Sequence, residues 1–228
     1  MRKLLPMLLL AALAAGCAPS PVPQALIAPA RPGLSAEQLA AALWSADPQR
    51  LRLRQTARFS FRGRSVPMIG MMELDTASQQ ARLVAVNEMG VKLFDLSVSE
   101  DAVRENYLLP QLARYPRFGE AVGASLRRVF LAPRPRPGED TLAAADGGYR
   151  LSGERDGQQV AFLFGGEPVR LVEKGAEGDQ GEWRAVYADY QPGAGTFFPR
   201  QIVLEDRRAG YRLDLRIESV KRSDEQTD

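Results

Sequence analysis

The side chains that most often carry out chemistry in proteins are scarce in this sequence of 228 residues. It contains no histidine and a single cysteine, Cys17. Histidine is the commonest general base and metal ligand near neutral pH, so catalysis of the Ser-His-Asp or Cys-His type has no base here. No nucleophile elbow, P-loop or dinucleotide-binding glycine motif occurs either. We therefore expect a protein that is not an enzyme and that holds no metal or other cofactor.

Paired carboxylates are the remaining candidates for catalysis. Glu73 with Asp75, and Glu205 with Asp206, could be arranged as in a glycosidase. Such a hydrolase would need two converging acids, one of them with a raised pKa. Both pairs fall at the ends of predicted strands and in hairpin turns, where carboxylates are ordinarily solvated, and this structural interpretation is favoured.

An arginine-rich run could bind phosphate or lipid head groups. Most of its members are two residues apart, so in a strand they would line one face, and a solvated strand face is the favoured interpretation. The run consists of Arg50, Arg52, Arg54, Arg58, Arg62 and Arg64.

Cys17 follows a short basic segment and an apolar run. Arg2 and Lys3 precede apolar residues 4–15, a run too short for the roughly 20-residue helix that spans a bilayer but typical of a secretory signal peptide. Residues 13–17, Leu-Ala-Ala-Gly-Cys, resemble the lipobox of bacterial lipoproteins. The resemblance implies cleavage before Cys17, a thioether-linked diacylglycerol on its sulfur, and an acylated amino terminus.

Lipidation implies a membrane partner, because two or three buried acyl chains hold a protein on a bilayer far more firmly than one. The residue after the cysteine is Ala18 rather than Asp. By analogy with well-studied diderm bacteria, this implies a lipid-anchored protein of the outer membrane that faces the periplasm.

The charge and length of the chain indicate what kind of domain follows the anchor. The chain has 30 basic and 28 acidic residues, and cleavage would remove two of the basic ones, leaving no net charge. Sequence-independent nucleic-acid binding requires clustered positive charge, so we expect no nucleic-acid partner. A chain of this length is sufficient for one domain with a sizeable core, which we expect to be a monomer.

The expected organisation has four parts. Residues 1–16 are the signal peptide and residues 17–33 a lipidated cysteine with a proline-rich tether, in which prolines favour an extended chain of up to roughly 50 Å. Residues 34–220 form a single domain, and residues 221–228 a polar tail. The domain starts with a helix capped by Ser35, which has the capping-box spacing to Gln38 and extends to about Trp44.

From about residue 57 the hydrophobic period becomes that of strands. A second helix is expected within residues 110–131, with a kink or late start at Pro116, and residues 132–148 read as a loop rich in proline and glycine. The fold class is mainly β with a few helices: a curled antiparallel sheet, or incomplete β-barrel, of about ten or eleven strands covered by helices. The predicted strands are residues 57–65, 67–75, 80–87, 90–99, 101–106, 149–153, 158–164, 168–174, 182–190, 199–206 and 211–220.

This layout resembles the LolA/LolB superfamily of periplasmic proteins. Residues 198–205 and 210–217 are similar to that family's closing hairpin, in which a proline-led strand and a charged turn precede an alternating strand. Residues 70–74 and 90–96 resemble lipoproteins placed in the same superfamily. The resemblance implies an apolar hollow between sheet and helices, because LolA-like members carry lipoprotein acyl chains and LolB-like members are lipoproteins that receive them.

We therefore expect a lipoprotein that binds a lipid or an acylated protein in an apolar hollow. The alternative is a scaffold lipoprotein of the envelope whose hollow is filled by its own side chains, and for any single residue plain core is the favoured interpretation. Methionine suits adaptable apolar sites. The candidates come from a methionine-rich set that also includes Met71 and Met89; the predicted lining residues are Met68, Met72, Phe94, Phe130 and Phe162.

Overall fold

The computed structural model describes residues 27–61, 63–179 and 181–223. The predicted signal peptide, Cys17, Arg62 and the last five residues lie outside these ranges. Within them, one antiparallel sheet of twelve strands is accompanied by two helices, α2 (Ala36–Ala41) and α3 (Phe118–Phe130). The strands are β1 (Arg50–Phe61), β2 (Arg64–Asp75), β3 (Gln80–Val86), β4 (Lys92–Val98), β5 (Val103–Leu108), β6 (Thr141–Ala145), β7 (Gly148–Arg155), β8 (Gln158–Gly165), β9 (Arg170–Gly178), β10 (Gly181–Gly193), β11 (Thr196–Asp206) and β12 (Tyr211–Arg222).

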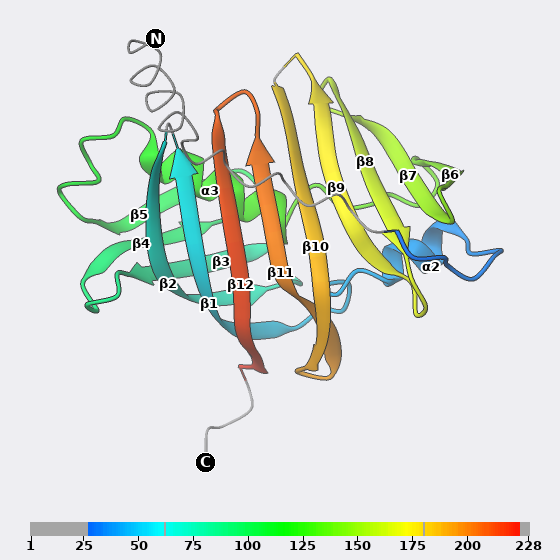
Figure 1. The fold of residues 1–228 in the computed structure, drawn as a ribbon, viewed down its shortest axis with the longest axis horizontal. Coiled ribbons are helices and arrows are strands. Elements are labelled where there is room, and N and C mark those ends of the chain that lie inside the picture. The colour runs from blue at the N-terminus through cyan, green and yellow to red at the C-terminus, as the bar shows by residue number, and fades with distance from the viewer. Residues whose placement is uncertain (1–26, 62, 180, 224–228) are drawn as a thin grey trace, which may run out of the picture.

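The sheet grows outward from its centre and is not closed. Its order is β5-β4-β3-β2-β1-β12-β11-β10-β9-β8-β7-β6, so β5 and β6 are opposite edges. The chain builds hairpins from β1 to β5, crosses through α3 to the far edge, and returns by hairpins to β12 beside β1. Strands β2–β5 curl behind β1 and β12, and α3 lies in the curl (Figure 1). The predicted fold class, an incomplete β-barrel covered by helices, is confirmed.

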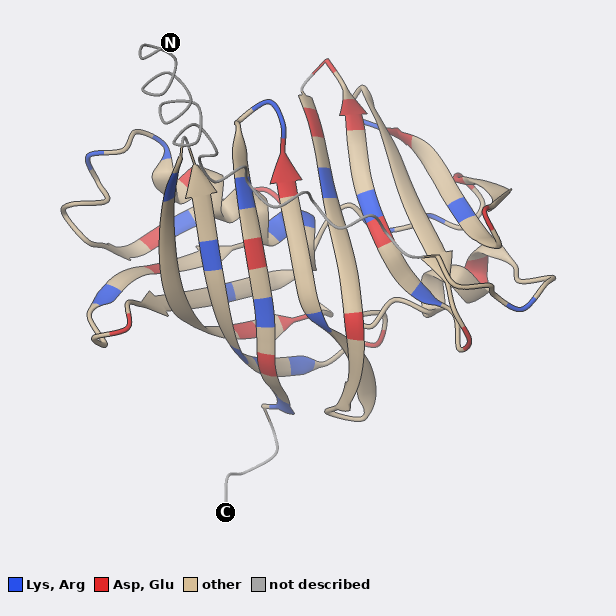
Figure 2. Cartoon of the chain, in the orientation of Figure 1, with Lys and Arg blue, Asp and Glu red and all other residues tan. Residues whose placement is uncertain are grey.

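Alternating burial gives the sheet one apolar and one charged face. On β1, Leu51 and Leu53 are buried while the arginines that alternate with them, Arg50, Arg52 and Arg54, are exposed. On β12, basic and acidic residues follow one another along the strand (Figure 2), and Arg212 pairs with Asp214 at 2.7 Å. This alternation is expected for an antiparallel sheet with one solvated side.

Several element boundaries differ from the predicted ones. The strand predicted from residue 57 starts at Arg50, and the first hairpin turns at Gly63, which has φ +74°, rather than near residue 66. The final strand continues to Arg222, into the predicted tail. The second helix has the late start, at Phe118. The first helix has the predicted capping box but ends at Ala41, three residues short.

Strand β6 lies inside the stretch predicted to be a loop. Its residues are exposed, apart from partly buried Ala145, and it forms an edge paired only with β7. No buried alternation marks such a strand in the sequence, because cross-strand hydrogen bonds rather than core packing hold it.

The last residues of the predicted tether are attached to the folded body. Ala28 accepts a hydrogen bond from the backbone N–H of Gly166 at 2.8 Å, and Ala30 donates one to Gly147 at 2.9 Å. Both partners lie in Gly-Gly turns of the β6–β9 region, and a Cβ on Gly165 would come within 2.9 Å of the Ala28 carbonyl oxygen. The absence of side chains therefore allows the segment to approach, and the folded body begins before Leu34.

Candidate functional site

Helix α3 covers the concave face of the first half of the sheet. Phe118, Leu126 and Phe130 point to the core, and Phe94 of β4 packs edge-to-face against Phe118 with ring centroids 5.7 Å apart. Arg117 precedes the helix with φ 62°, a conformation uncommon outside glycine, and no side chain caps the first turn. The amino-terminal end of α3 therefore meets the sheet through apolar side chains.

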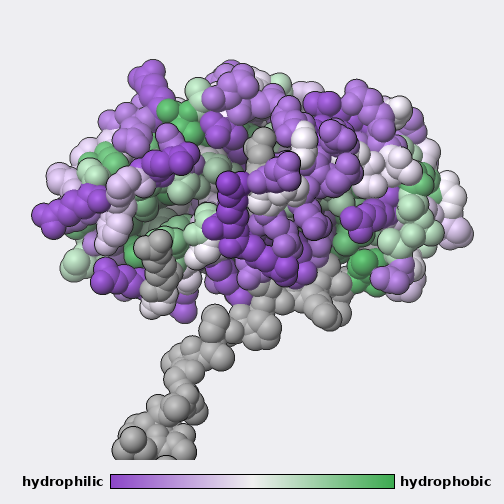
Figure 3. All heavy atoms as spheres, turned by 90° about the horizontal axis from the view of Figure 1, so that it is seen from above, coloured by the Kyte–Doolittle hydropathy of each residue, from purple (hydrophilic) through white to green (hydrophobic). Residues whose placement is uncertain are grey.

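An apolar cavity of about 520 Å³ lies at this end of α3. It is bounded by the tip of the β1–β2 hairpin, the segment before α3 with its first turn, and the start of β12. Figure 3 looks onto this end of the molecule and shows hydrophobic residues exposed among hydrophilic ones on the left, the side on which Figure 1 places α3. The lining residues are Phe59, Phe61, Arg64, Val66, Leu112, Tyr115, Pro116, Arg117, Phe118, Glu120, Ala121, Ala209 and Tyr211.

A smaller gap of about 40 Å³ lies deeper, between α3 and the strands. Phe59 and Phe118 line both spaces, so these two rings stand between the outer cavity and the inner gap. The other residues lining the gap are Gln55, Ala57, Met68, Gly70, Leu83, Ala85, Phe94, Val122, Ser125, Leu126, Leu213 and Leu215. We refer to the outer cavity and the inner gap together as the hollow.

Basic side chains stand at the mouth of the hollow. Arg64 and Arg117 line the outer cavity, and Arg117 pairs with Glu120 at 2.6 Å. The Glu120 carboxylate raises the pKa of Arg117 by hydrogen bonding to its guanidinium. The positive end of the α3 dipole lies at the same place. The mouth therefore combines an apolar wall with a basic rim.

A polar cluster joins α3 to the sheet beside the hollow. Ser125 Oγ lies 2.8 Å from Tyr211 Oη, and Arg128 donates to the same phenol oxygen at 3.2 Å and pairs with Asp206. Burial raises the pKa of the Tyr211 phenol, which therefore remains protonated over the physiological range. The cluster fixes the position of α3 over the cavity.

The second half of the concave face is filled by the protein itself. Phe162 of β8 is fully buried, and Trp44, which follows α2, packs edge-to-face on Phe130 at 6.1 Å. Lys174 of β9 is buried among these residues with its Nζ 3.4 Å from the Pro133 carbonyl oxygen. Burial, with Arg134 nearby, lowers the pKa of Lys174 to about 7. The hollow is thus confined to the part of the concave face under the first half of α3.

The predicted lining residues separate into two groups. Met68 and Phe94 line the inner gap, whereas Met72, Phe130 and Phe162 lie in the packed core and line neither space. Of the other methionines in that set, Met71 is half exposed on the outer face, and Met89 is 83% exposed in the β3–β4 turn.

Most of the outer cavity's lining was missed by sequence reasoning. Phe59 and Phe61 continue the inward alternation of β1, and Leu112, Tyr115 and Phe118 recur at helical spacing before and into α3. Both patterns identify apolar faces but do not indicate that these two faces meet around open space. Tyr115 is about half exposed at the mouth.

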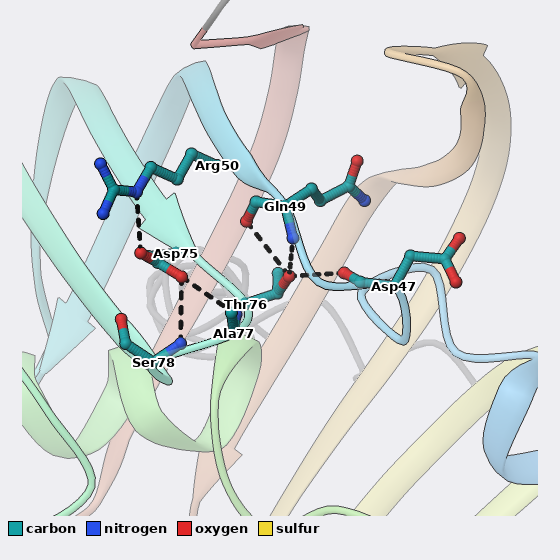
Figure 4. A network of polar contacts seen from close by, with 7 residues as sticks. All are labelled: Asp47, Gln49, Arg50, Asp75, Thr76, Ala77 and Ser78. Atoms are coloured by element: carbon teal, nitrogen blue, oxygen red, sulfur yellow. Dashed lines mark hydrogen bonds and ion pairs between the residues drawn. The ribbon is translucent and has the colours of Figure 1, made fainter.

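The carboxylates considered for catalysis are used by turns and ion pairs. Asp75 accepts hydrogen bonds from the backbone N–H groups of Ala77 and Ser78, both at 3.0 Å, and from Arg50 at 2.9 Å (Figure 4). The Ser78 N–H makes the largest contribution to lowering the pKa of Asp75, whereas a general acid needs a raised one. Asp206 likewise accepts from Ala209 N–H at 2.7 Å.

No cluster of three or more potential metal-ligating side chains occurs among the described residues. Across the same ranges, neither helix is long and apolar enough to span a membrane. Among the described members of the arginine-rich run, Arg50, Arg52, Arg54 and Arg58 are exposed on the outer face of β1, and Arg64 reaches the mouth of the hollow.

Comparison with known proteins identifies the class of fold. A crystal structure of a LolA superfamily protein from Nitrosomonas europaea matches with a TM-score of 0.57 at 11% identity, covering 85% of this chain and 96% of that one. A putative outer membrane lipoprotein-sorting protein domain from Vibrio parahaemolyticus matches with a TM-score of 0.54 at 8% identity, covering 85% of this chain and 93% of that one. The protein has the LolA-like fold that the sequence resemblance predicted.

The sequence itself defines a narrower group. The family model described as "Protein of unknown function (DUF3261)" matches residues 52–220, and the chain belongs to this family. No curated protein matches the sequence.

Proposed function

We propose that this protein is a bacterial envelope lipoprotein that binds a lipid or lipoprotein acyl chain in the hollow, without catalysing a reaction. The observation that carries the proposal is the apolar cavity of about 520 Å³ between α3 and the curled sheet, which leads toward the inner gap. Binding pockets for small molecules typically measure about 300–1,000 Å³ and are mostly apolar. The LolA-like fold supports the proposal by analogy.

The two ends of the hollow suit the two ends of an amphiphile. The inner gap is lined by apolar side chains such as Phe94 and Leu126, which suit a hydrocarbon tail. Arg64 and Arg117 at the mouth would face an anionic head group such as a carboxylate or phosphate. If the tail enters the hollow first, the charged head group stays in solvent, which avoids the free-energy cost of burying its charge.

The membrane anchor is a separate part of the proposal. Cys17 and the residues before it lie outside the described ranges, and the lipobox-like sequence supports lipidation there. Lipidation predicts that wild-type protein sediments with membranes and incorporates labelled fatty acid, whereas Cys17→Ser does neither. Density-gradient separation of inner and outer membranes then tests the outer-membrane location implied by Ala18. Labelled wild-type protein in the inner-membrane fraction would refute that location.

Native mass spectrometry tests the binding proposal directly. The chain from residue 18 onward is produced in the periplasm behind a cleavable leader, so that no anchor of its own can enter the hollow. A co-purifying mass that matches a phospholipid, fatty acid or acylated peptide supports the carrier function and identifies the cargo. A clean unliganded mass with no uptake of added lipid would refute it and favour a scaffold lipoprotein.

A further inference from the structure

A buried glutamine faces the inner gap with an unused hydrogen-bond acceptor. Gln55 of β1 is 2% exposed and lines the gap between α3 and the strands. Its side-chain Oε1 has no hydrogen-bond partner among the residues that the structure describes. A buried polar atom without a partner destabilises a fold, and most buried side-chain polar atoms have one. Gln55 therefore requires an explanation.

The neighbouring strands make room for this side chain. Gly70 of β2 lies directly opposite Gln55, and a Cβ there would come within 3.0 Å of both Gln55 Cγ and Leu83 Cδ1. On the other side, the pairing of β1 with β12 shifts between Arg54 and Gln55, leaving an additional residue on β12. β-bulges of this kind redirect side chains and are common beside functional sites. The glutamine thus occupies a space formed by two irregular features of the sheet.

The remaining polar side chain of the gap is already engaged. Ser125 lies within hydrogen-bond distance of the Ala121 carbonyl oxygen, at 2.9 Å, and of Tyr211 Oη, at 2.8 Å. All other residues that line the gap are apolar or glycine. The gap of about 40 Å³ has room for one water, which occupies about 30 Å³ in the liquid, or for a hydroxyl-bearing carbon.

We propose that Gln55 selects an acyl chain that carries a hydroxyl group in its tail. This inference rests on the proposed function, because it names the kind of chain that the hollow accepts. A hydroxyl both donates and accepts, so it satisfies the glutamine amide whichever of its two polar atoms faces the gap. An unsubstituted chain reaching the same depth displaces any water and leaves the amide unpaired.

The position of Gln55 sets the position of the hydroxyl. Phe59 and Phe61 line the outer cavity on the same face of β1, four and six residues from Gln55. At about 3.3 Å per residue, these separations are roughly 13 and 20 Å. Half the thickness of a bilayer core, the depth of one acyl chain, is roughly 15 Å. The hydroxyl that meets Gln55 is therefore deep in the tail rather than next to the head group.

Three fatty acids of equal length test the inference: dodecanoate, 3-hydroxydodecanoate and 12-hydroxydodecanoate, the last of which carries its hydroxyl on the terminal carbon. Affinities are measured by titration calorimetry on the full chain carrying Cys17→Ser, so that no anchor lipid competes. We expect the 12-hydroxy acid to bind about tenfold more tightly than dodecanoate, and the 3-hydroxy acid to bind like dodecanoate. Gln55→Met, which has similar length and no amide, should bring the ratio of the 12-hydroxy acid's affinity to that of dodecanoate close to one. Met68→Leu, in the same gap, should change all three affinities alike.

Each outcome separates the inference from the function on which it rests. Equal wild-type affinities for dodecanoate and the 12-hydroxy acid would overturn the role of Gln55 while supporting the carrier function. A preference that persists in Gln55→Met would do the same. Failure of the wild type to bind any of the three acids would refute both. If Gln55→Met does not fold, Gly70→Ala provides the second test, since it displaces the glutamine without removing its amide and should reduce the preference.

Discussion

Ser125 of α3 and Tyr211 of β12 are hydrogen-bonded across the boundary of the hollow, with their oxygens 2.8 Å apart. Ser125 lines the inner gap, and Tyr211 lines the outer cavity. The two residues are 86 positions apart in the chain, so the bond links the crossover helix to the strand that completes the sheet. Arg128, held by Asp206, supports the same phenol oxygen. The side chains that line the hollow therefore also hold α3 in place over it.

Removing the phenol oxygen should loosen α3. Tyr211→Phe is expected to lower the free energy of unfolding by about 1–3 kcal/mol, because the buried Ser125 and the partly buried Arg128 both lose a partner. Ser125→Ala should lower the free energy of unfolding by about 1 kcal/mol, and the double variant should lower it by less than the sum of the two single changes. Urea denaturation measures all three. Tyr107→Phe on the edge strand is the control, and an equal loss there would contradict the proposed role of the cluster.

Filling the outer cavity should block ligand binding without unfolding the protein. Ala121 of α3 lines that cavity and is only partly buried, so Ala121→Trp can place its ring in open space. Lipid uptake measured by native mass spectrometry should fall at least about tenfold, while the melting temperature changes little. The control is Ala188→Trp, at an exposed position on β10. Undiminished uptake by a folded Ala121→Trp variant would place the ligand elsewhere.

The buried Lys174 should make stability depend on pH. Its pKa is about 7 in the folded protein and 10.5 ordinarily, so between these values the unfolded chain binds more protons. The free energy of unfolding should therefore rise with pH, by up to about 1.4 kcal/mol per pH unit between these two values. Below the lower value Lys174 is charged in both states, so burial of the charge destabilises the folded protein by its full amount.

Lys174→Met should remove this pH dependence. The variant should be more stable than the wild type, by a margin larger at pH 6 than at pH 10. Urea denaturation across this range measures the margin, with Lys221→Met on the exposed end of β12 as the control. A margin that does not change with pH would show that the amine is not desolvated.

The basic rim should favour anionic amphiphiles. Arg64→Glu reverses the charge at the mouth and should weaken binding of a fatty acid by about two- to fivefold, with the effect shrinking as salt is added. Arg58→Glu, on the outer face of the same hairpin, is the matched control because it makes the same charge change away from the mouth. Binding assays at two ionic strengths distinguish them, and equal effects of the two variants would argue against head-group recognition by Arg64.

The strands that could be predicted are those in which apolar and polar residues alternate. On β12, Leu215 and Ile217 face the core while Arg216 and Glu218 face solvent, and the sequence alone predicts this strand. The capping box of Ser35 and Gln38 is equally local, since its donors and acceptors lie within one turn. Strand β6 was not predictable, because it is exposed and exists through its pairing with β7.

The candidate site was predicted less well than the fold. Alternation and helical spacing show which way a side chain points but not what lies opposite. Met72 and Met68 share one face of β2, yet Met72 is buried in the packed core and Met68 borders the inner gap. Gln55 carried no signal, since a single polar residue in an alternating strand does not show whether its amide has a partner.

The sequence by itself determined which common catalytic groups the chain lacks and which residues lie on each face of the sheet. The absence of histidine removes the commonest general base, and the period of two assigns apolar and charged residues to opposite sides. The tertiary structure alone decided where the concave face is filled and where it is hollow. Covering elements such as α3 and Trp44 meet the strands from distant parts of the chain, and the space they leave depends on how the side chains pack together.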